Sequence, residues 1–564
     1  MIAKPIVHYM KHLLPKLLLS LLPVAASAQR APTWTQVSTL LTPGVSTVSP
    51  VLATDAAGNT YVAGAFTQTI ALAAGTTLTS QGSQDGFVAK YDAAGALLWQ
   101  RQLAGASNEY FQAIVVDASG HVALLASASD GTQLGTTTFT ASSFDKSVVL
   151  ALLSPEGQVQ SMQEVATGSL LLPQSLARDP AGNYYVGGQF ALSATVGTTN
   201  LTTPIATTGY AWDQFVTKVS TTGTPQWVVQ GGRVFITAGR YTPLFPSHLA
   251  AGAGGVYFNW TCNETTTDFG GLALPTGLGD YDGLAVKIDA QGTPQWAKRL
   301  GGAGADVSTN GQLDAAGRFV VPGLSTTAGY FDSPANVNNI VSTGLVTVLE
   351  PAAGAPVWTQ QLTATSGGSF RDVTSDAAGN LYLTGTFSGQ GALGGTTLTG
   401  AGGLDAVVVS YAANGTLRWV QQSTGTGDEN PGAIALDGSN HLSLVGMVNG
   451  NGQFGSIAAN SPVSSTTQGS PFVARLGSIV TAIRAGQQAA PLALYPNPAA
   501  AAGTVALPRL PAGTQLTLLD ATGRVVRRLP ATPTLPLAGL ASGLYAVQAA
   551  SPSGEQWSCR LVVE

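Results

Sequence analysis

The chain has 564 residues, which is too long for one ordinary domain and allows two or three. Only 9% of the residues are charged and 44% are hydrophobic, which excludes the highly charged, weakly hydrophobic composition of disordered chains. The formal net charge of −5 is spread along the chain without a basic stripe, so nucleic acid is not expected as a partner. The 69 glycines favour an all-β protein with frequent tight turns.

Residues 1–28 have the layout of a secretory signal peptide. Lys4, Lys11 and Lys16 give a positive start, Leu17 to Val24 forms a short apolar run, and Ala26-Ser27-Ala28 matches a small-residue cleavage site. We therefore expect this segment to be removed during export. A membrane anchor is the alternative, but the apolar run is short for a bilayer, and no transmembrane segment is predicted after the signal is removed.

Two landmarks recur in the same order along the chain, which indicates an internal repeat. The first is a turn of the form Asp-x-x-Gly. It occurs at Asp55–Gly58, Asp117–Gly120, Asp179–Gly182, Asp314–Gly317, Asp376–Gly379 and, with Asn in the last place, Asp437–Asn440, and a degenerate copy lies at Ala251–Gly254. The second is a glycine followed four residues later by tryptophan, at Gly95/Trp99, Gly223/Trp227, Gly292/Trp296, Gly354/Trp358 and Gly415/Trp419.

Each repeat predicts four antiparallel strands. The four are exemplified in order by Ala113–Val116, Tyr382–Thr386, Phe87–Tyr91 and Leu98–Leu103. In the connecting turns the Asp side chain can bond its own backbone and the Gly can take a positive φ. Four antiparallel strands per repeat are typical of a propeller blade, so residues 30–477 are predicted to form a seven-bladed β-propeller. The extra length of each repeat falls between its second and third strands.

The two ends of the repeat region complement each other. The last copy ends at Phe472–Leu476 without a fourth strand, and Trp34–Val37 resembles the fourth strand that begins at Trp99. We therefore predict that an N-terminal strand completes the last blade and closes the ring, which removes exposed sheet edges. An open stacked solenoid is the alternative, but it would not need complementary ends.

The repeat resembles the bacterial seven-bladed propeller repeat. Gly58–Phe66, Gly182–Phe190 and Gly379–Phe387 match its opening motif, and Asp85–Lys90 and Asp213–Lys218 match its later strand. The resemblance covers residues 34–477 and implies a fold rather than an activity.

After the repeats, residues 478–494 are predicted to be a linker to a small domain at residues 495–564. Its candidate motif residues are Tyr495, Pro496, Asn497, Pro498, Gly543 and Tyr545, with a basic-Leu-Val-Val ending at Arg560–Val563. This pattern resembles the type A sorting domain of the type IX secretion system of Bacteroidetes. The resemblance implies a small β-sandwich, the type IX secretion machinery as a partner, and a final location on the outer cell surface or outside the cell. An ordinary accessory β-sandwich is the alternative.

The sequence offers little catalytic chemistry. No Ser/His/Asp arrangement or His-Glu-x-x-His motif is visible, so no catalytic residue and no cofactor is predicted. A carboxylate recurs just before the third strand, at Asp85, Asp145, Asp213, Asp282 and Asp405. These side chains could surround a calcium ion, although a dense run of ligands is missing, or each could cap its own turn.

The longer connections of the repeats are predicted to share one face of the propeller, where binding surfaces tend to lie. The candidate ligand-binding residues on this face are Glu109, Tyr110, Trp212, Arg240, Tyr241, Phe245, Asp306, Arg371, Asp428 and Glu429. We therefore expect a non-enzymatic propeller that binds or scaffolds a polysaccharide or a surface protein. The alternatives are an extracellular glycan lyase or hydrolase, and a structural surface element without a specific ligand.

Overall fold

The computed structural model describes most of the chain, and the predicted signal peptide at residues 1–28 lies outside the described part. The described residues are 31–39, 50–142, 146–206, 209–237, 246–263, 268–276, 281–301, 304–326, 342–461, 469–479, 490–520, 525–551 and 556–564. They contain β-strands and no helix, which confirms the all-β prediction. The chain divides into two compact units, residues 1–479 and 480–564.

The repeated turns show why the strands begin where they do. The Asp55 carboxylate accepts hydrogen bonds from the backbone N–H groups of Ala57 (3.0 Å) and Asn59 (2.9 Å). Gly58 has a φ of 85°, a conformation that glycine adopts without steric cost, and Asn440 takes this place in the last copy with a φ of 62°. Each turn therefore reverses the chain between two antiparallel strands.

The first unit contains, in its described residues, seven main sheets of antiparallel strands, and in all but the last the strands follow chain order. The first sheet has β2 (Val51–Thr54), β3 (Thr60–Phe66), β6 (Asp85–Tyr91) and β7 (Leu97–Ala104). The second has β8 (Tyr110–Val116), β9 (Val122–Ala128), β12 (Lys146–Leu153) and β13 (Val159–Gly168). The third has β14 (Leu170–Arg178), β15 (Tyr184–Ala191), β19 (Gly209–Val219) and β20 (Pro225–Thr237), with β18 (Ile205–Ala206) beside β19.

The remaining sheets follow the same plan. The fourth has β21 (His248–Gly252), β22 (Gly255–Asn263), β25 (Tyr281–Ile288) and β26 (Pro294–Leu300). In the fifth, β27 (Asp306–Ser308) and β28 (Gln312–Leu313) both pair with β29 (Phe319–Thr326), followed by β30 (Ser342–Leu349) and β31 (Pro356–Ala364). The sixth has β32 (Gly368–Ser375), β33 (Leu381–Phe387), β36 (Asp405–Tyr411) and β37 (Leu417–Gln422). The seventh has β38 (Asp428–Leu436), β39 (Leu442–Asn449), β42 (Ser470–Leu476) and β1 (Trp34–Thr39).

The extra length between the second and third strands of a repeat forms short hairpins. They are β4 (Thr69–Ala73) with β5 (Thr76–Thr79), β10 (Gln133–Leu134) with β11 (Thr137–Thr138), β16 (Ser193–Val196) with β17 (Thr199–Thr202), β23 (Asp268–Phe269) with β24 (Leu272–Ala273), β34 (Gln390–Leu393) with β35 (Thr396–Thr399), and β40 (Asn451–Phe454) with β41 (Ile457–Asn460). Four of these hairpins extend the sheet of the preceding repeat, because β10 pairs with β7, β16 with β13, β23 with β20, and β34 with β31.

The core of the first unit lies between neighbouring sheets. Every residue of β3, β6, β15, β33 and β36 is buried, so both faces of these strands are covered. One cluster joins Leu150 of the second sheet to Val186 and Phe215 of the third. Apolar burial of this kind is the main driving force of folding, and here each sheet depends on its neighbours for it.

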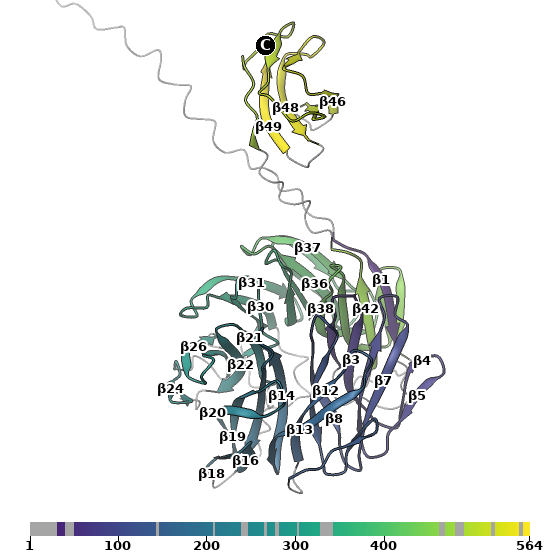
Figure 1. The fold of residues 1–564 in the computed structure, drawn as a ribbon, viewed down its shortest axis with the longest axis vertical. Coiled ribbons are helices and arrows are strands. Elements are labelled where there is room, and N and C mark those ends of the chain that lie inside the picture. The colour runs from purple at the N-terminus through teal and green to yellow at the C-terminus, as the bar shows by residue number, and fades with distance from the viewer. Residues whose placement is uncertain are drawn as a thin grey trace, which may run out of the picture. The chain divides into compact units, whose positions relative to one another are not determined.

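The first strands of the seven sheets contact one another in a closed series. β2 contacts β8, β8 contacts β14, and the series continues through β21, β28, β32 and β38 back to β2. Figure 1 shows the result at the closure, where the purple β1 and β3 lie beside the green β38 and β42.

The N-terminal strand completes the seventh sheet, because β1 pairs antiparallel with β42 as expected. The register differs from the sequence expectation by two residues. Trp99 lies opposite Lys90 in the first sheet, whereas in the seventh Gln36 lies opposite Arg475 and Trp34 lies opposite Leu476. Trp34 instead packs its ring edge-on against Phe454, with the ring centroids 5.0 Å apart. Trp34 therefore packs against the β40–β41 hairpin, which follows the second strand of the seventh sheet.

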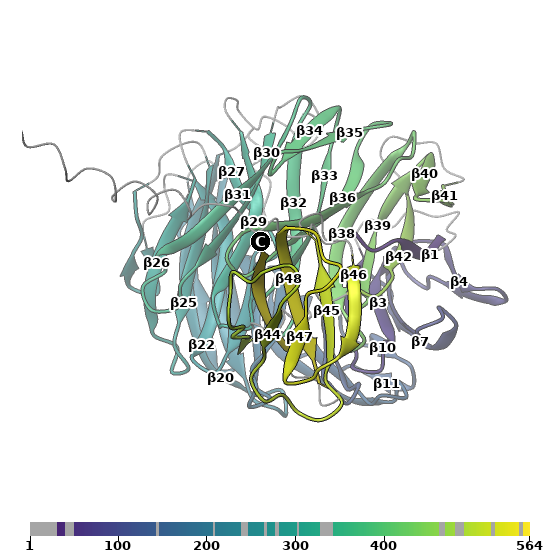
Figure 2. The same cartoon turned by 90° about the horizontal axis from the view of Figure 1, so that it is seen from above.

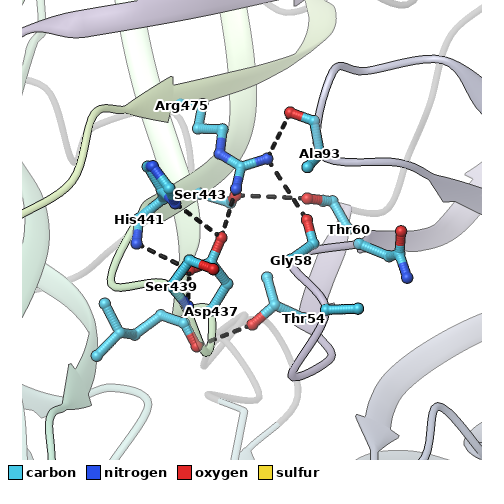
Figure 3. A network of polar contacts seen from close by, with 12 residues as sticks. Thr54, Gly58, Thr60, Ala93, Asp437, Ser439, His441, Ser443 and Arg475 are labelled. Atoms are coloured by element: carbon cyan, nitrogen blue, oxygen red, sulfur yellow. Dashed lines mark hydrogen bonds and ion pairs between the residues drawn. The ribbon is translucent and has the colours of Figure 1, made fainter.

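A polar network joins the seventh sheet to the first (Figure 3). The Arg475 guanidinium contacts the buried Asp437 carboxylate and donates to the carbonyl of Ala93 at 2.7 Å. The Thr54 hydroxyl donates to the carbonyl of Leu436 at 2.9 Å. The closing contact is thus polar as well as apolar.

The described residues of the second unit form a five-stranded and a two-stranded sheet. The larger contains β43 (Ala490–Pro491), β49 (Gln556–Val563), β48 (Gly543–Ala550), β45 (Gln515–Leu519) and β46 (Val525–Pro530); the smaller contains β44 (Thr504–Ala506) and β47 (Thr534–Pro536). Figure 2 shows β48, β45 and β46 side by side. A single apolar cluster, which includes Leu516, Leu535 and Val547, holds the two sheets together.

Candidate functional site

The first strands carry irregularities that all fall at one repeat position. The register of β8 shifts between Phe111 and Ala113, that of β32 between Phe370 and Asp372, and that of β38 between Pro431 and Ala433. A β-bulge leaves one residue unpaired and re-aims its side chain, and bulges are frequent beside functional sites. In these three strands the unpaired residue is the fifth before the turn residue of its repeat. Across all seven repeats, the equivalent position is held by Pro50, Gln112, Gln174, Pro246, Thr309, Arg371 and Gly432.

These seven positions line one cavity of about 530 Å³. Residues from the first strands of all seven sheets contribute to it, and His248, Asn310, Gln312 and Asp372 add polar groups. The volume falls within the range of about 300–1,000 Å³ that is typical of small-molecule sites. The cavity is therefore the candidate functional site of the first unit.

Hydrogen bonds between neighbouring sheets hold the cavity wall. The Gln174 side-chain oxygen accepts bonds from the Ser247 backbone N–H (2.9 Å) and hydroxyl (2.6 Å). The Asn310 backbone N–H donates to the Arg371 carbonyl at 3.2 Å. The Asp372 carboxylate accepts from the backbone N–H groups of Val373 (2.9 Å) and Ile434 (2.8 Å). The wall is consequently fixed by bonds that run from one sheet to the next.

The cavity has three ionisable lining residues among those described, His248, Arg371 and Asp372. Burial lowers the pKa of His248 to about 3, so its imidazole is neutral at neutral pH. Burial also raises the pKa of Asp372 to about 7, against the lowering effect of its hydrogen bonds to backbone N–H groups. Arg371 keeps its charge although burial lowers its pKa, because a guanidinium does not deprotonate in proteins.

The predicted ligand-binding residues occupy several separate places. Arg240, Tyr241 and Phe245 lie outside the described residues. Of those described, only Arg371 lines the cavity. Glu109, Asp306 and Glu429 are buried, with at most 2% of their surface exposed, whereas Tyr110, Trp212 and Asp428 are half-buried.

The two buried glutamates, Glu109 and Glu429, contact other groups of the protein. Glu109 lies 3.6 Å from the Lys146 ammonium, and burial raises its pKa. Glu429 accepts a hydrogen bond from the Ser423 hydroxyl at 2.8 Å, and burial raises its pKa to about 7. Their carboxylates are covered by protein rather than presented to a ligand.

The recurring carboxylates before the third strands bind protein groups. Asp85 accepts from the backbone N–H of Gln81 at 3.0 Å, and Asp405 from that of Ala401 at 3.1 Å, as expected for side chains that cap their own turns. Asp213 instead pairs with Arg233, and Asp282 with Arg299. Asp145 lies outside the described residues. Within the described ranges, no group of three or more His, Cys, Asp or Glu side chains is placed to hold a metal ion.

The sequence analysis missed most of the cavity, although a signal was present. Gln112, Gln174, His248, Asn310 and Asp372 were not predicted as site residues. Aligning the repeats on their turn aspartate places the fifth preceding residue at one structural position, and this alignment would have identified the ring of cavity residues.

The predicted sorting-motif residues lie in the second unit. The Asn497 side chain makes two hydrogen bonds to β49. Its amide nitrogen donates to the Arg560 carbonyl (2.6 Å), and its oxygen accepts from the Val562 N–H (2.9 Å). Tyr495 is 81% exposed, and Pro496 and Pro498 flank Asn497. Gly543 begins β48, and the Tyr545 hydroxyl donates to the Ala541 carbonyl at 2.8 Å.

Comparison with solved structures gives remote likenesses. They include a mitotic checkpoint complex (12% identity, 78% of this chain and 96% of that chain, TM-score 0.36) and PorZ, an essential bacterial surface component of the type-IX secretion system of Porphyromonas gingivalis (10%, 94% and 100%, 0.13). A third is a rhamnogalacturonan lyase of Bacillus licheniformis (10%, 93% and 91%, 0.27). Scores this low carry no argument about the fold or the function of this chain. No curated protein matches the sequence.

Residues 493–564 match the family model of the secretion system C-terminal sorting domain. In the described part of the chain, no helix has the length and apolarity needed to cross a membrane. The second unit is therefore a type IX sorting domain, which interacts with that secretion machinery and marks the chain for export to the cell surface or the extracellular space.

Proposed function

We propose that residues 30–477 form a seven-bladed β-propeller that binds a ligand outside the cell without transforming it. Seven sheets of four antiparallel strands, contacts that return from β38 to β2, and completion of the last sheet by β1 all support this proposal. In the same proposal, residues 1–28 are a signal peptide and residues 478–494 are a linker.

The observation that carries the binding proposal is the cavity at the first strands. All seven sheets contribute to its wall, and bulged residues such as Gln112 and Arg371 contribute to its lining. Amide and guanidinium groups suit recognition of a polar ligand such as part of a polysaccharide. A surface-exposed protein segment is a further ligand that such a cavity could hold.

An extracellular glycan lyase or hydrolase is the second candidate. Asp372 favours it, because a carboxyl group in a cavity with a pKa of about 7 has a value suited to acid–base catalysis near neutral pH. However, the carboxylate oxygens of Asp372 already accept backbone hydrogen bonds from Val373 and Ile434. This arrangement supports a role in joining two sheets, and we therefore place binding first.

Thermal unfolding of the purified protein tests binding. The protein is heated alone, with a panel of neutral and acidic polysaccharides, with calcium and with EDTA. A polysaccharide that binds only the folded state should raise the midpoint, by about 2.7 kcal/mol of stabilisation at a hundredfold excess over its dissociation constant. If no ligand shifts the midpoint, a structural surface element is favoured. Cleavage of any polysaccharide would favour the enzyme. Destabilisation by EDTA would indicate a calcium site.

A truncation tests the export signal. A chain that ends after residue 490 lacks the sorting domain and should accumulate inside the cell envelope, because residues 493–564 carry the export signal. Immunoblots of cells and medium measure its distribution, with the full-length chain as the control. Secretion of the truncated chain at the full-length level would contradict the role of this domain.

A further inference from the structure

The seven residues at the bulge position form a ring with a single charge. They are Pro50, Gln112, Gln174, Pro246, Thr309, Arg371 and Gly432, and all of them line the cavity. A sequence under selection only to close the ring could place a neutral residue at each position, as it does at six of them. Arg371 therefore breaks the repeat symmetry at one point of the wall.

The Arg371 guanidinium has no protein partner within the described residues. Its Nε atom is buried and makes no hydrogen bond, and no carboxylate forms an ion pair with it. The neighbouring Asp372 directs its carboxylate to backbone N–H groups instead. Arg371 is partly exposed and lines the cavity, and a charge with reduced access to water is favoured by a counter-charge. An unpaired guanidinium at a cavity wall is consequently a site for an anion.

The rest of the wall limits the kind of anion. Gln112, Gln312 and Asn310 offer amide groups that both donate and accept hydrogen bonds, which matches the hydroxyl groups of a sugar. The guanidinium fork matches a carboxylate by two parallel hydrogen bonds. A volume of about 530 Å³ leaves room for a compact ligand of this kind.

We propose that Arg371 recognises the carboxylate of a sugar acid, whose hydroxyl groups bond to the amides of the same cavity. This inference deepens the binding function proposed above and rests on it. A single charged residue, Arg371, then determines the class of ligand, because it favours acidic sugars over neutral sugars of the same size.

Isothermal titration of the purified full chain tests the inference with four probes: sodium glucuronate, glucose, sodium acetate and sodium phosphate. Glucuronate should bind, and glucose and acetate should each bind at least about tenfold more weakly, because each lacks one half of the recognition. Phosphate should also bind more weakly, since it lacks the sugar hydroxyl pattern. Equal affinity for glucose or phosphate would overturn the assignment.

Substitutions locate the binding. Arg371→Gln should weaken glucuronate binding by about ten- to a hundredfold and leave any glucose binding unchanged, as expected for loss of a charge-assisted hydrogen bond. Arg371→Lys keeps the charge without the fork and should give an intermediate loss. Lys298→Gln removes one positive charge from a residue that does not line the cavity, and it should bind glucuronate as the unsubstituted protein does.

The outcomes separate this inference from the proposed function. Unchanged glucuronate affinity in Arg371→Gln would overturn the role of Arg371. If Arg371→Gln does not fold, an unchanged affinity in Arg371→Lys serves the same purpose. If glucuronate does not bind but a neutral polysaccharide stabilises the protein, the sugar-acid inference fails while the binding function stands.

Discussion

Arg475 takes the place that lysine holds in other sheets. Lys90 of the first sheet and Lys287 of the fourth each donate to a carbonyl in the turn before the fourth strand of the next sheet, at 3.3 Å and 2.8 Å. Arg475 makes the same contact from the seventh sheet to Ala93 of the first, and it also contacts Asp437. The seam at which the chain closes therefore uses the same type of contact as the junctions between consecutive sheets.

Substitution of Arg475 should test the strength of the seam. Arg475→Met removes the guanidinium from the buried Asp437 carboxylate, which keeps its contacts with Ser439 and His441, and should lower the free energy of unfolding by about 3 kcal/mol. Arg475→Lys is the matched control, because lysine serves at the equivalent positions, and it should lose much less. Urea unfolding at pH 7 measures both. An equal loss for the two variants would show that the charge is not what matters.

Glu429 should make stability depend on pH. Burial raises its pKa to about 7, so the folded protein holds this proton more tightly than the unfolded chain does. Stability should consequently fall as pH rises from about 4.5 to 7, and the cost of the ionised group should be constant above that window.

Glu429→Gln removes this cost and should raise the free energy of unfolding at pH 8 by on the order of 2 kcal/mol, with little change at pH 4. Glu350→Gln is the control, because hydrogen bonds from the Ala352 and Ala353 N–H groups lower the pKa of Glu350. It should not stabilise at pH 8. Urea unfolding at the two pH values measures the difference, and a pH-independent effect of Glu429→Gln would refute the assignment.

At the level of single residues, the sequence predicted the turn residues well but predicted few residues of the candidate site. Asp55 and Gly58 act locally, so their roles follow from the spacing of the turn. The environment of Glu429 and the cavity position of Asp372 depend on which residues of distant strands cover them. Spacing along the chain does not contain that information.

Tryptophans in the fourth strands of the first, third, fourth and fifth sheets join each of these sheets to the next. The indole N–H of Trp99 donates to Pro155, that of Trp296 to Pro351 and that of Trp358 to Ala413, at 2.9–3.2 Å. The acceptor is always a carbonyl in the turn between the third and fourth strands of the following sheet. Trp419 has no such partner, because the seventh sheet takes its fourth strand from the N-terminal segment and lacks this turn.

This difference provides a matched pair of substitutions. Trp358→Phe removes a hydrogen bond between two sheets and should lower the free energy of unfolding by about 1 kcal/mol more than Trp419→Phe does. Trp358 is partly exposed whereas Trp419 is 4% exposed, so a larger loss in Trp358→Phe cannot come from apolar burial and reports the bond. Thermal unfolding of the two variants tests it, and equal midpoints would show that the indole N–H groups do not contribute.

At the level of elements, the repeat predicted the four strands because each has local turn signals. The pairing of hairpins such as β10–β11 with the preceding sheet could not be predicted, because it depends on which strand edge lies nearby in space. The shift of β1 by two residues has a similar cause, since Trp34 contacts Phe454 of a hairpin rather than the next sheet.

For the whole first unit, the N-terminal strand is the element on which closure depends. Deletion of residues 31–39 would expose the edge of β42 and the apolar face that Trp34 covers. The truncated protein should unfold at a lower temperature and should associate, because a free edge pairs with other chains. Light scattering and thermal unfolding measure these effects. A monomer with an unchanged midpoint would contradict the role of β1, and recovery on adding a peptide of residues 31–39 would support it.

The all-β class and the C-terminal sorting domain could be predicted for the whole chain, since both rest on composition and ordered motifs. The candidate cavity could not be predicted, because it depends on seven residues that come together only when the first strands do.

Completion of the seventh sheet by β1 also bears on the order of folding events. In the other six sheets the four main strands come from one repeat, whereas the hydrogen bond from Thr35 to Arg475 spans 440 residues. Closing so long a loop costs entropy that local pairings avoid, and contacts of large sequence separation slow folding. We expect β1 to be placed last, after β42 has emerged and folded. Until then, the nascent protein carries an unpaired strand at one end and an unfinished sheet at the other.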